Sequence, residues 1–206
     1  MYTVGPVREN CYLVRREGSD RALLIDPGDE APRLQKAMAD LGVEPAAILL
    51  THTHFDHIGA VAAIARATGV PVYCPRGELE VLEQPDKFFP PMFGPVEGWT
   101  AEHALDGGQR LQLAGFDVDV VSTPGHSPDH VTFAIDGALF SGDVLFENSI
   151  GRTDLPGADH ATLLASIAAL LERFDDDTKV HPGHMGLTTL GRERATNPFL
   201  QALAER

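Results

Sequence analysis

The strongest chemical signal in this sequence is a group of four potential metal ligands within six residues, namely His52, His54, Asp56 and His57. They follow the apolar run 46–50, which is short and predicts a buried strand. In an extended chain His52 and His54 leave the same face, and the other two ligands follow in the turn. Imidazole and carboxylate groups are ligands that zinc, iron and manganese sites use. The spacing therefore predicts a metal site at the carboxyl end of a strand rather than a polar surface loop.

Three further segments place a potential ligand at the end of a predicted strand. Glycine lets the backbone turn sharply and approach a neighbour closely, and proline restricts the conformations of the turn. Each segment alone is a weak signal, but together with the first group they form a consistent set of ligands. The segments are Thr123-Pro124-Gly125-His126, Ser141-Gly142-Asp143 and His181-Pro182-Gly183-His184.

The elements that must position these ligands alternate between strands and helices in the first half of the chain. This alternation favours a layered α/β domain over an all-β one. Besides the strand before His52, strands are expected at 11–14, 22–25 and 70–74, and helices at 31–41 and 58–67.

The second half begins with strands and ends with helices. Strands are expected at 110–113, 117–122, 131–135 and 138–141, the last two forming a hairpin across Asp136-Gly137. A helix begins at Asp159 and continues over 161–174, a short strand covers 179–181, and Asn197-Pro198 begins a last helix. No linker or convincing repeat divides the chain, so one domain spanning residues 1–206 is expected.

The segment 84–103 interrupts the regular pattern with four prolines and four aromatic residues. A loop of this length is usually functional or disordered, and its aromatic content argues against disorder. Two interpretations remain open: an apolar wall or lid for a substrate groove, or a loop held down by its own aromatic side chains. The aromatic residues are Phe88, Phe89, Phe93 and Trp99.

The composition excludes several function classes. The chain has 16 basic and 30 acidic residues and a formal charge of −14, which disfavours nucleic acids and anionic membranes as partners. No apolar run is long enough to span a bilayer, and the first thirty residues contain no signal-peptide core. Cys11 and Cys74 belong to no C-x-x-C pair and are interpreted as two buried, reduced thiols. A cytoplasmic protein is therefore expected; the oligomeric state is not indicated.

At this point the motifs resemble those of metallo-β-lactamase-fold hydrolases, most closely the short glyoxalase II-like branch. The resemblance covers essentially the whole chain and implies a mixed α/β (α+β) fold, a four-layer αββα sandwich with a binuclear metal site at one edge. Its motifs are T-H-T-H-F-D-H-I-G (51–59), T-P-G-H-S-P (123–128), S-G-D-V-L-F (141–146), S-I-G-R-T-D-L-P-G (149–157), H-P-G-H (181–184) and N-P-F-L (197–200).

The resemblance also implies a ligand set of seven residues. His52, His54 and His126 would bind one ion, Asp56, His57 and His184 would bind the second, and Asp143 would bridge the two. Zinc is the first expectation for both ions, with iron or manganese as alternatives. His103, His130, His160 and His181 are interpreted as surface or structural residues, with support of a ligand as the alternative for His130, which is close to the site in sequence. Arg152 and Asp154 are expected to shape the floor of the site.

Such a site favours hydrolysis on physical grounds. Two cations about 3.5–4 Å apart hold a bridging hydroxide near neutral pH and stabilise the oxyanion that forms from a carbonyl. A small thioester is a suitable substrate because a thiolate, with a thiol pKa of about 8.5, leaves without a strong general acid. Asp56 is the expected catalytic residue, as both a metal ligand and an acceptor that orients the hydroxide. We therefore predict a glyoxalase II-like hydrolase of a 2-hydroxyacyl-glutathione or another acyl-thiol, with no organic cofactor.

Two departures and two alternatives qualify this prediction. Met185 and Asp129 stand where the related sequences often have glycine, and the chain lacks the C-terminal helical domain with which longer glyoxalase II enzymes grip glutathione. The first alternative is a persulfide dioxygenase, which resembles this sequence in the stretch Gly151 to Asp154 and uses one iron at positions equivalent to His52, His126 and Asp143. The second, a metal-stabilised binding domain, is disfavoured because a structural zinc needs only four ligands.

Overall fold

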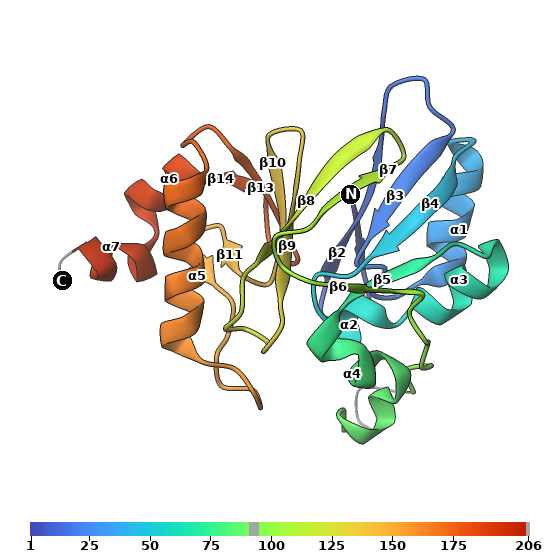
Figure 1. Cartoon of the computed structure of the whole chain (residues 1–206), viewed down its shortest axis with the longest axis horizontal. Helices are drawn as coiled ribbons and strands as arrows, with labels where there is room; N and C mark the ends of the chain where they lie inside the picture. Colours follow the sequence, from blue (N-terminus) through green and yellow to red (C-terminus); the bar gives the residue numbers. More distant parts are fainter. Residues whose placement is uncertain (91–94, 205–206) are drawn as a thin grey trace.

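The computed structural model describes residues 1–90 and 95–204, with side chains to residue 201. Two six-stranded sheets pack face to face, and helices cover the outer face of each (Figure 1). This arrangement confirms the predicted αββα sandwich. In Figure 1 the N-terminal sheet and its helices lie on the right, and the C-terminal sheet with its helices lies on the left.

The first sheet has the strand order β1-β2-β3-β4-β5-β6. Its first three strands pair antiparallel, and β3 to β6 pair parallel, because helices connect the later strands. The strands are β1 (Tyr2–Val4), β2 (Glu9–Arg15), β3 (Arg21–Ile25), β4 (Glu44–Leu49), β5 (Val72–Pro75) and β6 (His103–Leu105). The helices α1 (Ala31–Asp40) and α3 (Val61–Thr68) cover its outer face (Figure 1).

The second sheet has the order β14-β13-β10-β9-β8-β7, in which only β10 and β13 pair parallel. Its strands are β7 (Arg110–Leu113), β8 (Phe116–Ser122), β9 (Val131–Ile135), β10 (Ala138–Gly142), β13 (Lys179–Pro182) and β14 (Thr188–Thr189). A small ribbon, β11 (Leu145–Phe146) and β12 (Ser149–Ile150), stands apart from it. The helices α5 (His160–Arg173), α6 (Leu190–Thr196) and α7 (Pro198–Ala204) lie on the C-terminal side (Figure 1).

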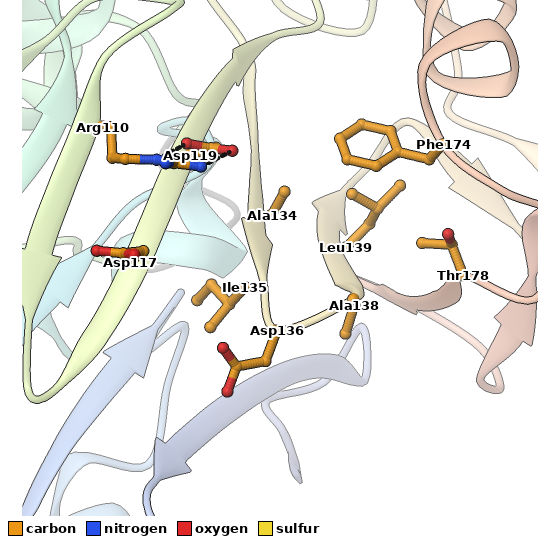
Figure 2. Close-up of a pocket in the computed structure, with 11 residues that line it drawn as sticks. Arg110, Asp117, Asp119, Ala134, Ile135, Asp136, Ala138, Leu139, Phe174 and Thr178 are labelled. Carbon is orange, nitrogen blue, oxygen red and sulfur yellow. Dashed lines mark hydrogen bonds and ion pairs between the residues drawn. The ribbon is translucent and has the colours of Figure 1, made fainter.

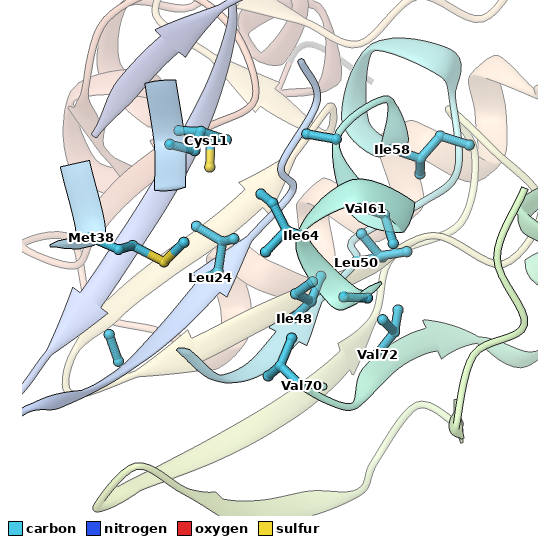
Figure 3. Packing of buried hydrophobic residues seen from close by; sticks show 14 of the residues in the cluster. Cys11, Leu24, Met38, Ile48, Leu50, Ile58, Val61, Ile64, Val70 and Val72 are labelled. Carbon is cyan, nitrogen blue, oxygen red and sulfur yellow. The ribbon is translucent and has the colours of Figure 1, made fainter. Parts of the chain in front are cut away.

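Alternating side chains of the first sheet fill two different apolar layers. Leu24 and Ile48 face outward and pack with Met38 of α1 and Ile64 of α3 (Figure 3). Leu49, next to Ile48 in the chain, faces the opposite way and packs between the two sheets. Because successive strand residues point to opposite faces, a strand buried on both sides is apolar throughout.

The second sheet divides its side chains in the same way. Val120 of β8 and Phe133 of β9 pack between the sheets, whereas Val121 and Leu139 face Ile167 of α5. Three apolar layers therefore hold the four structural layers together, and the polar ligands are left at the strand ends.

The predicted helix 58–67 is partly wrong, because the structure divides it into α2 (Phe55–Ile58) and α3. Gly59 lies against the backbone of Gly28, where an added Cβ would stand 2.3 Å from the Gly28 carbonyl oxygen. The amide of Ala60 donates to the carbonyl of Pro27 at 2.9 Å. The break therefore lets the turn after β3 pack directly against the segment that carries Asp56.

The segment 84–103 is held down by its aromatic side chains over the part that the structure describes. Phe89 and Trp99 pack against the outer core of the first sheet, and Phe88 remains 46% exposed. Short helices precede and enter the segment: η1 (Arg76–Glu78), α4 (Leu79–Glu83) and η2 (Pro85–Lys87). Phe93 lies outside the described residues. Sequence reasoning missed these helices, the edge strands β1, β6 and β14, the ribbon β11–β12 and helix α6, all of them short.

Cys11 and Cys74 are both buried and unpaired, as predicted. Among the residues with described positions, no helix has the length and apolar character needed to cross a membrane.

A core truncation between the sheets tests the layered packing. Leu49 is fully buried in that layer, so Leu49→Ala is expected to lower the free energy of unfolding by about 2–5 kcal/mol in urea denaturation. The control Leu41→Ala removes the same group from a position that is 44% exposed and is expected to change it little. Equal losses in the two variants would contradict the assigned layer.

Candidate metal centre

The first group of ligands consists of three histidines from two loops. His52 and His54 follow β4, and His126 follows β8. The Nδ1 atom of His54 lies 3.1 Å from Nε2 of His52 and 2.8 Å from Nε2 of His126. These three nitrogens belong to one set of donor atoms that all lie within 4.8 Å of one another.

The second group combines helix α2 with the loop after β13. Asp56 and His57 lie on α2, and His184 follows β13. The Oδ2 atom of Asp56 is 3.1 Å from Nε2 of His184 and 3.9 Å from Nε2 of His57. Their donor atoms also lie within 4.8 Å of one another.

The carboxylate of Asp143, just after β10, lies between the two groups. Its Oδ2 atom is 3.5 Å from Nε2 of His126 in the first group and 3.5 Å from Nε2 of His184 in the second. Its Oδ1 atom is 3.4 Å from Nε2 of His57. The structure thus brings together all seven residues that the sequence predicted as ligands, although the metal itself stays a prediction.

The donor atoms fit a cation. Within the described residues, Nε2 of His57 and Oδ1 of Asp143 are buried and have no hydrogen-bond partner. An unsatisfied buried acceptor costs stability, and a buried carboxylate costs more. A positive ion between these atoms would satisfy both of them, and nitrogen with carboxylate oxygen is a donor set suited to zinc, iron or manganese.

Hydrogen bonds on the far side of each ring direct the free lone pairs toward this space. Nδ1 of His126 donates to the backbone carbonyl of Arg152 at 2.9 Å, and Nδ1 of His57 donates to Oδ2 of Asp26 at 3.1 Å. A neutral imidazole has one N–H, so Nε2 of each ring then carries the lone pair. Both rings are therefore held in the tautomer that binds a metal.

Asp26 holds a ligand of each group and was missed as a site residue. Its Oδ1 accepts from the amide of Thr51 at 2.8 Å, and its Oδ2 accepts from the Thr51 hydroxyl at 2.7 Å. Because that hydroxyl donates to Asp26, it accepts from Nδ1 of His52 at 3.0 Å. The same carboxylate binds His57, so it orients both rings. The only sequence signal was the strand-ending turn Asp26-Pro27-Gly28, interpreted as a turn alone.

Glu78, also missed, joins the loops of the first group. Its Oε2 accepts from the amide of Thr53 at 2.6 Å and from the Thr53 hydroxyl at 2.8 Å, and its Oε1 accepts from the Ser127 hydroxyl. Thr53 lies between two ligands and Ser127 directly follows a third. Burial raises the pKa of this carboxyl despite these hydrogen bonds.

His130 supports Asp143, which was the alternative rather than the first interpretation of this residue. Its Nε2 accepts from the amide of Asp143 at 3.2 Å, and its Nδ1 faces the hydroxyl of Thr123 at 3.0 Å. The ring is fully buried, 4.8 Å from that of His52. Of the remaining histidines, His103 stacks on Tyr73, His181 stacks on Phe140, and His160 is exposed at the start of α5.

Glycine permits the close approach of these loops. An added Cβ at Gly28 would stand 1.6 Å from the carbonyl oxygen of Asp56. At Gly183 it would stand 2.3 Å from Oδ1 of Asp143 and 2.7 Å from Cε1 of His57. Neither position has room for a side chain, so both turns require glycine.

The two groups differ in how tightly they hold protons when no metal is bound. Burial, followed by the charge of His126, lowers the pKa of His54 to about 4. Burial also lowers the pKa of His184, but its hydrogen bond to Asp56 and the charge of Asp143 outweigh this and raise it. The same opposition, with Asp143 and Asp56 as the raising charges, raises the pKa of His57 well above its ordinary value. The three histidines of the first group are therefore neutral at pH 7. The two histidines of the second group bind protons more readily than an ordinary histidine does.

Arg152 and Asp154 contribute less through their side chains than expected. They form an ion pair with each other at 2.7 Å, and both side chains are more than half exposed. The contact of Arg152 with the ligands is made by its backbone carbonyl, which accepts from His126. The side chains therefore lie outside the ligand cluster.

A cavity of about 270 Å³ lies at the turn between β9 and β10, away from the ligand cluster (Figure 2). Asp136, in the turn before β10, and Ala138, its first residue, line this cavity, whereas Asp143 follows the last residue of β10. Of its charged residues, Asp119 pairs with Arg110 and Asp136 with Arg16, whereas Asp117 accepts a hydrogen bond from the side-chain amide of Gln112 at 3.3 Å. This cavity is thus separated from the ligand cluster.

Known proteins are similar to this chain in sequence and in fold. The profile of the metallo-beta-lactamase superfamily matches residues 4–184. The hydroxyacylglutathione hydrolase GloC of Haemophilus influenzae is 36% identical over 205 residues, covering 95% of this chain and 94% of that protein. The crystal structure of BLEG-1 B3 metallo-beta-lactamase is 41% identical with a TM-score of 0.90, covering 96% of this chain and 97% of that one. That of TTHA1623 in a di-iron-bound form is 46% identical with a TM-score of 0.86, covering 97% and 98%.

The difference in pKa predicts ordered metal loss on acidification. Because the pKa values of His57 and His184 are raised above the ordinary 6.5, protons compete with a metal ion for these two rings at a higher pH than for an ordinary histidine. His54, with a pKa of about 4, takes up a proton only at a much lower pH. Lowering the pH from about 7.5 to about 5 is therefore expected to release about half of the bound metal, from the second group first. Metal analysis after equilibration at each pH measures this, with histidine NMR assigning the group. Simultaneous loss from both groups would contradict it.

Removing the charge of Asp26 is expected to weaken both groups at once. An asparagine side chain offers one oxygen where the Asp26 carboxylate accepts three hydrogen bonds, so Asp26→Asn leaves at least one donor unpaired. We expect metal affinity to fall about 10–100-fold, measured by competition with a chelator. The control Asp29→Asn makes the same change at an exposed carboxylate and should retain the metal. Unchanged affinity in Asp26→Asn would show that this carboxylate does not orient the ligands.

Proposed function

This chain belongs to the metallo-β-lactamase superfamily, and from that premise we propose that it is a binuclear metal-dependent hydrolase of small thioesters. The observation that carries the proposal is the position of Asp143, whose carboxylate lies within 3.5 Å of ligand atoms in both groups. A single-ion site would have no use for the second group, which also gathers two histidines and a carboxylate. We therefore assign one ion to each group and Asp143 to both.

When bound, two divalent ions would supply a hydroxide near neutral pH and stabilise the developing oxyanion of a carbonyl. His52, His54 and His126 would hold the first ion, and Asp56, His57 and His184 the second. Zinc is the first choice, with iron or manganese as alternatives, and iron is supported by the similarity to TTHA1623 in its di-iron-bound form.

Asp56 is the residue to which we assign a catalytic role. Its Oδ2 atom already faces His184 at 3.1 Å, and its side chain remains 13% exposed. The carboxylate pKa is lowered: burial raises it, but the charge of His57 and the hydrogen bond from His184 outweigh this. A carboxylate that stays ionised can accept a hydrogen bond from an attacking water and orient it.

A thioester suits this site because its leaving group needs little assistance. A thiol with a pKa of about 8.5 leaves as thiolate at moderate cost, whereas an amine must be protonated. The similarity to GloC, named as a hydroxyacylglutathione hydrolase, supports a 2-hydroxyacyl-thiol as the substrate class. Glutathione or another thiol carrier would then be the product released with the acid.

A β-lactam is the second candidate substrate. The similarity to BLEG-1, whose crystal structure is that of a B3 metallo-beta-lactamase, supports it. The same attack on a carbonyl opens a β-lactam amide, but the leaving nitrogen then needs a proton. We place this candidate second because a thiolate leaves without that proton.

Substitution of one ligand in each group tests the assignment. His54→Ala and Asp56→Ala are expected to reduce hydrolysis of a lactoyl thioester at least about 100-fold, with the fold retained by circular dichroism. The measurement is thiol release under substrate saturation. The control His160→Ala, at an exposed histidine outside the cluster, should keep the wild-type rate. Near-wild-type rates in either ligand variant would refute the mechanism.

Metal content separates the remaining alternatives. Close to two ions per chain with thioester turnover supports the proposal, and turnover of a chromogenic cephalosporin alone would replace the substrate class. Close to one iron per chain, with oxygen uptake on a persulfide and no thioester turnover, would instead assign a mononuclear dioxygenase that uses His52, His126 and Asp143.

A further inference from the structure

A cavity of about 290 Å³ opens directly beside the second group of ligands. It lies where the turn between β1 and β2 meets the loop after β13. This position makes it the space into which one half of a substrate extends when its carbonyl lies over the ligands. Its lining residues are Thr3, Val7, Arg8, Asn10, His184 and Met185.

Arg8 is a cation that has no carboxylate partner among the described residues. Among the lysines and arginines that the structure describes, only Arg8, Arg15 and Lys179 have no carboxylate oxygen within 4 Å. Only Arg8 of these three lines the cavity. In a chain with a formal charge of −14, the surrounding field repels anions, so an unpaired arginine at this place offers local attraction.

Two of the lining residues have a backbone conformation that favours glycine. Arg8 has φ 61° and Met185 has φ 68°, both in the left-handed region that residues with a Cβ rarely adopt. Arg8 is exposed, and Met185 is 58% exposed. Neither side chain is buried in the core, so core packing does not offset the backbone strain at these positions. Backbone strain at a position where the side chain adds no core packing points to a function for that side chain.

The two strained turns are held in fixed relation to each other. The side-chain amide of Asn10 donates to the carbonyls of Pro182 and Met185 at 3.2 and 3.0 Å, and its backbone amide donates to the carbonyl of Gly183 at 2.7 Å. Arg8 is therefore two residues from an anchor that also fixes the loop carrying His184. A subsite on such a frame is already organised before a ligand binds.

We propose that Arg8 and Met185 form a subsite for the thiol half of an anionic thioester. Arg8 pairs with a negatively charged group of the thiol carrier, a carboxylate or a phosphate, while Met185 and Val7 contact its aliphatic part. The proposal rests on the thioesterase function above and adds the chemical class of the thiol. The small neutral 2-hydroxyacyl group then lies over the metal ligands.

Glycine substitutions test this without endangering the fold. Arg8→Gly and Met185→Gly remove the side chains while relieving the left-handed backbone, so both variants are expected to unfold at the same or a higher temperature than the wild type. The matched control is Arg15→Ala, which removes a cation that also has no carboxylate partner in the described part of the chain and that donates a hydrogen bond to the carbonyl of Leu41 at 3.5 Å. Arg8→Lys keeps the charge and should retain part of the effect.

Paired substrates identify the charge that Arg8 recognises. Lactoyl thioesters of glutathione and of its dimethyl ester differ in carboxylates, and those of coenzyme A and of pantetheine differ in phosphates. Arg8→Gly is expected to raise KM for one of the anionic members about 3–10-fold with kcat unchanged, and to leave the counterpart that lacks those anionic groups unaffected. Met185→Gly should raise KM for both members of a pair. Which charged member responds distinguishes a carboxylate from a phosphate.

An equilibrium measurement separates failure of the subsite from failure of the proposed function. Calorimetric titration with S-methylglutathione and with desulfo-coenzyme A, neither of which can be hydrolysed, should show weaker binding of one of them to Arg8→Gly than to the wild type and to Arg15→Ala. Turnover by the wild type with unchanged KM and binding in Arg8→Gly would overturn the subsite alone. Absence of any thioester turnover by the wild type would overturn the proposed function, and weaker anion binding by Arg8→Gly would still support the subsite.

Discussion

The structure depends on one buried carboxylate that connects the two halves of the ligand cluster. Asp26 follows β3 and accepts hydrogen bonds from both polar groups of Thr51 and from the ring of His57. Through the Thr51 hydroxyl it also sets the ring of His52. A buried anion is costly unless such donors surround it. The donors here belong to Thr51, just after β4, and to His57 of α2, so satisfying Asp26 requires the correct packing of all three segments.

The close packing of these segments follows from the same requirement. Gly28 and Gly183 let backbone and ligand atoms approach to distances that no side chain would allow. Helix α2 is consequently short, because the chain must turn at Gly59 to keep contact with the Asp26-Pro27-Gly28 turn. The apolar layers stabilise the fold. The loops at the strand ends carry the ligand side chains, and hydrogen bonds orient their rings so that the nitrogen lone pairs point into one common space. Preorganised donors of this kind need little rearrangement to accept a cation.

Supporting contacts also distinguish the two groups chemically. The first consists of imidazoles that burial keeps neutral, whereas the second places two imidazoles between two carboxylates. The second group is also the more open, since His184 is 21% exposed whereas His52 is fully buried. It borders the cavity formed with the turn between β1 and β2. A substrate would therefore approach over the second group, and the first group would act mainly through its charge.

The sequence by itself determined the layered fold, most of the longer elements and all seven clustered ligand candidates. Spacing within one strand end and glycine-proline turns are local properties, so His52, His54, Asp56 and His57 could be identified without coordinates. Only the tertiary structure decided what supports them. Asp26, Glu78 and the turn carrying Arg8 are distant from the ligands in sequence. Pairing of β3 with β4 places Asp26 beside Thr51, whereas packing of one sheet on the other brings Glu78 to Ser127 and Arg8 to the cavity that His184 lines. Short edge strands and the break at Gly59 were equally invisible, because contacts between distant segments, rather than local propensity, determine them.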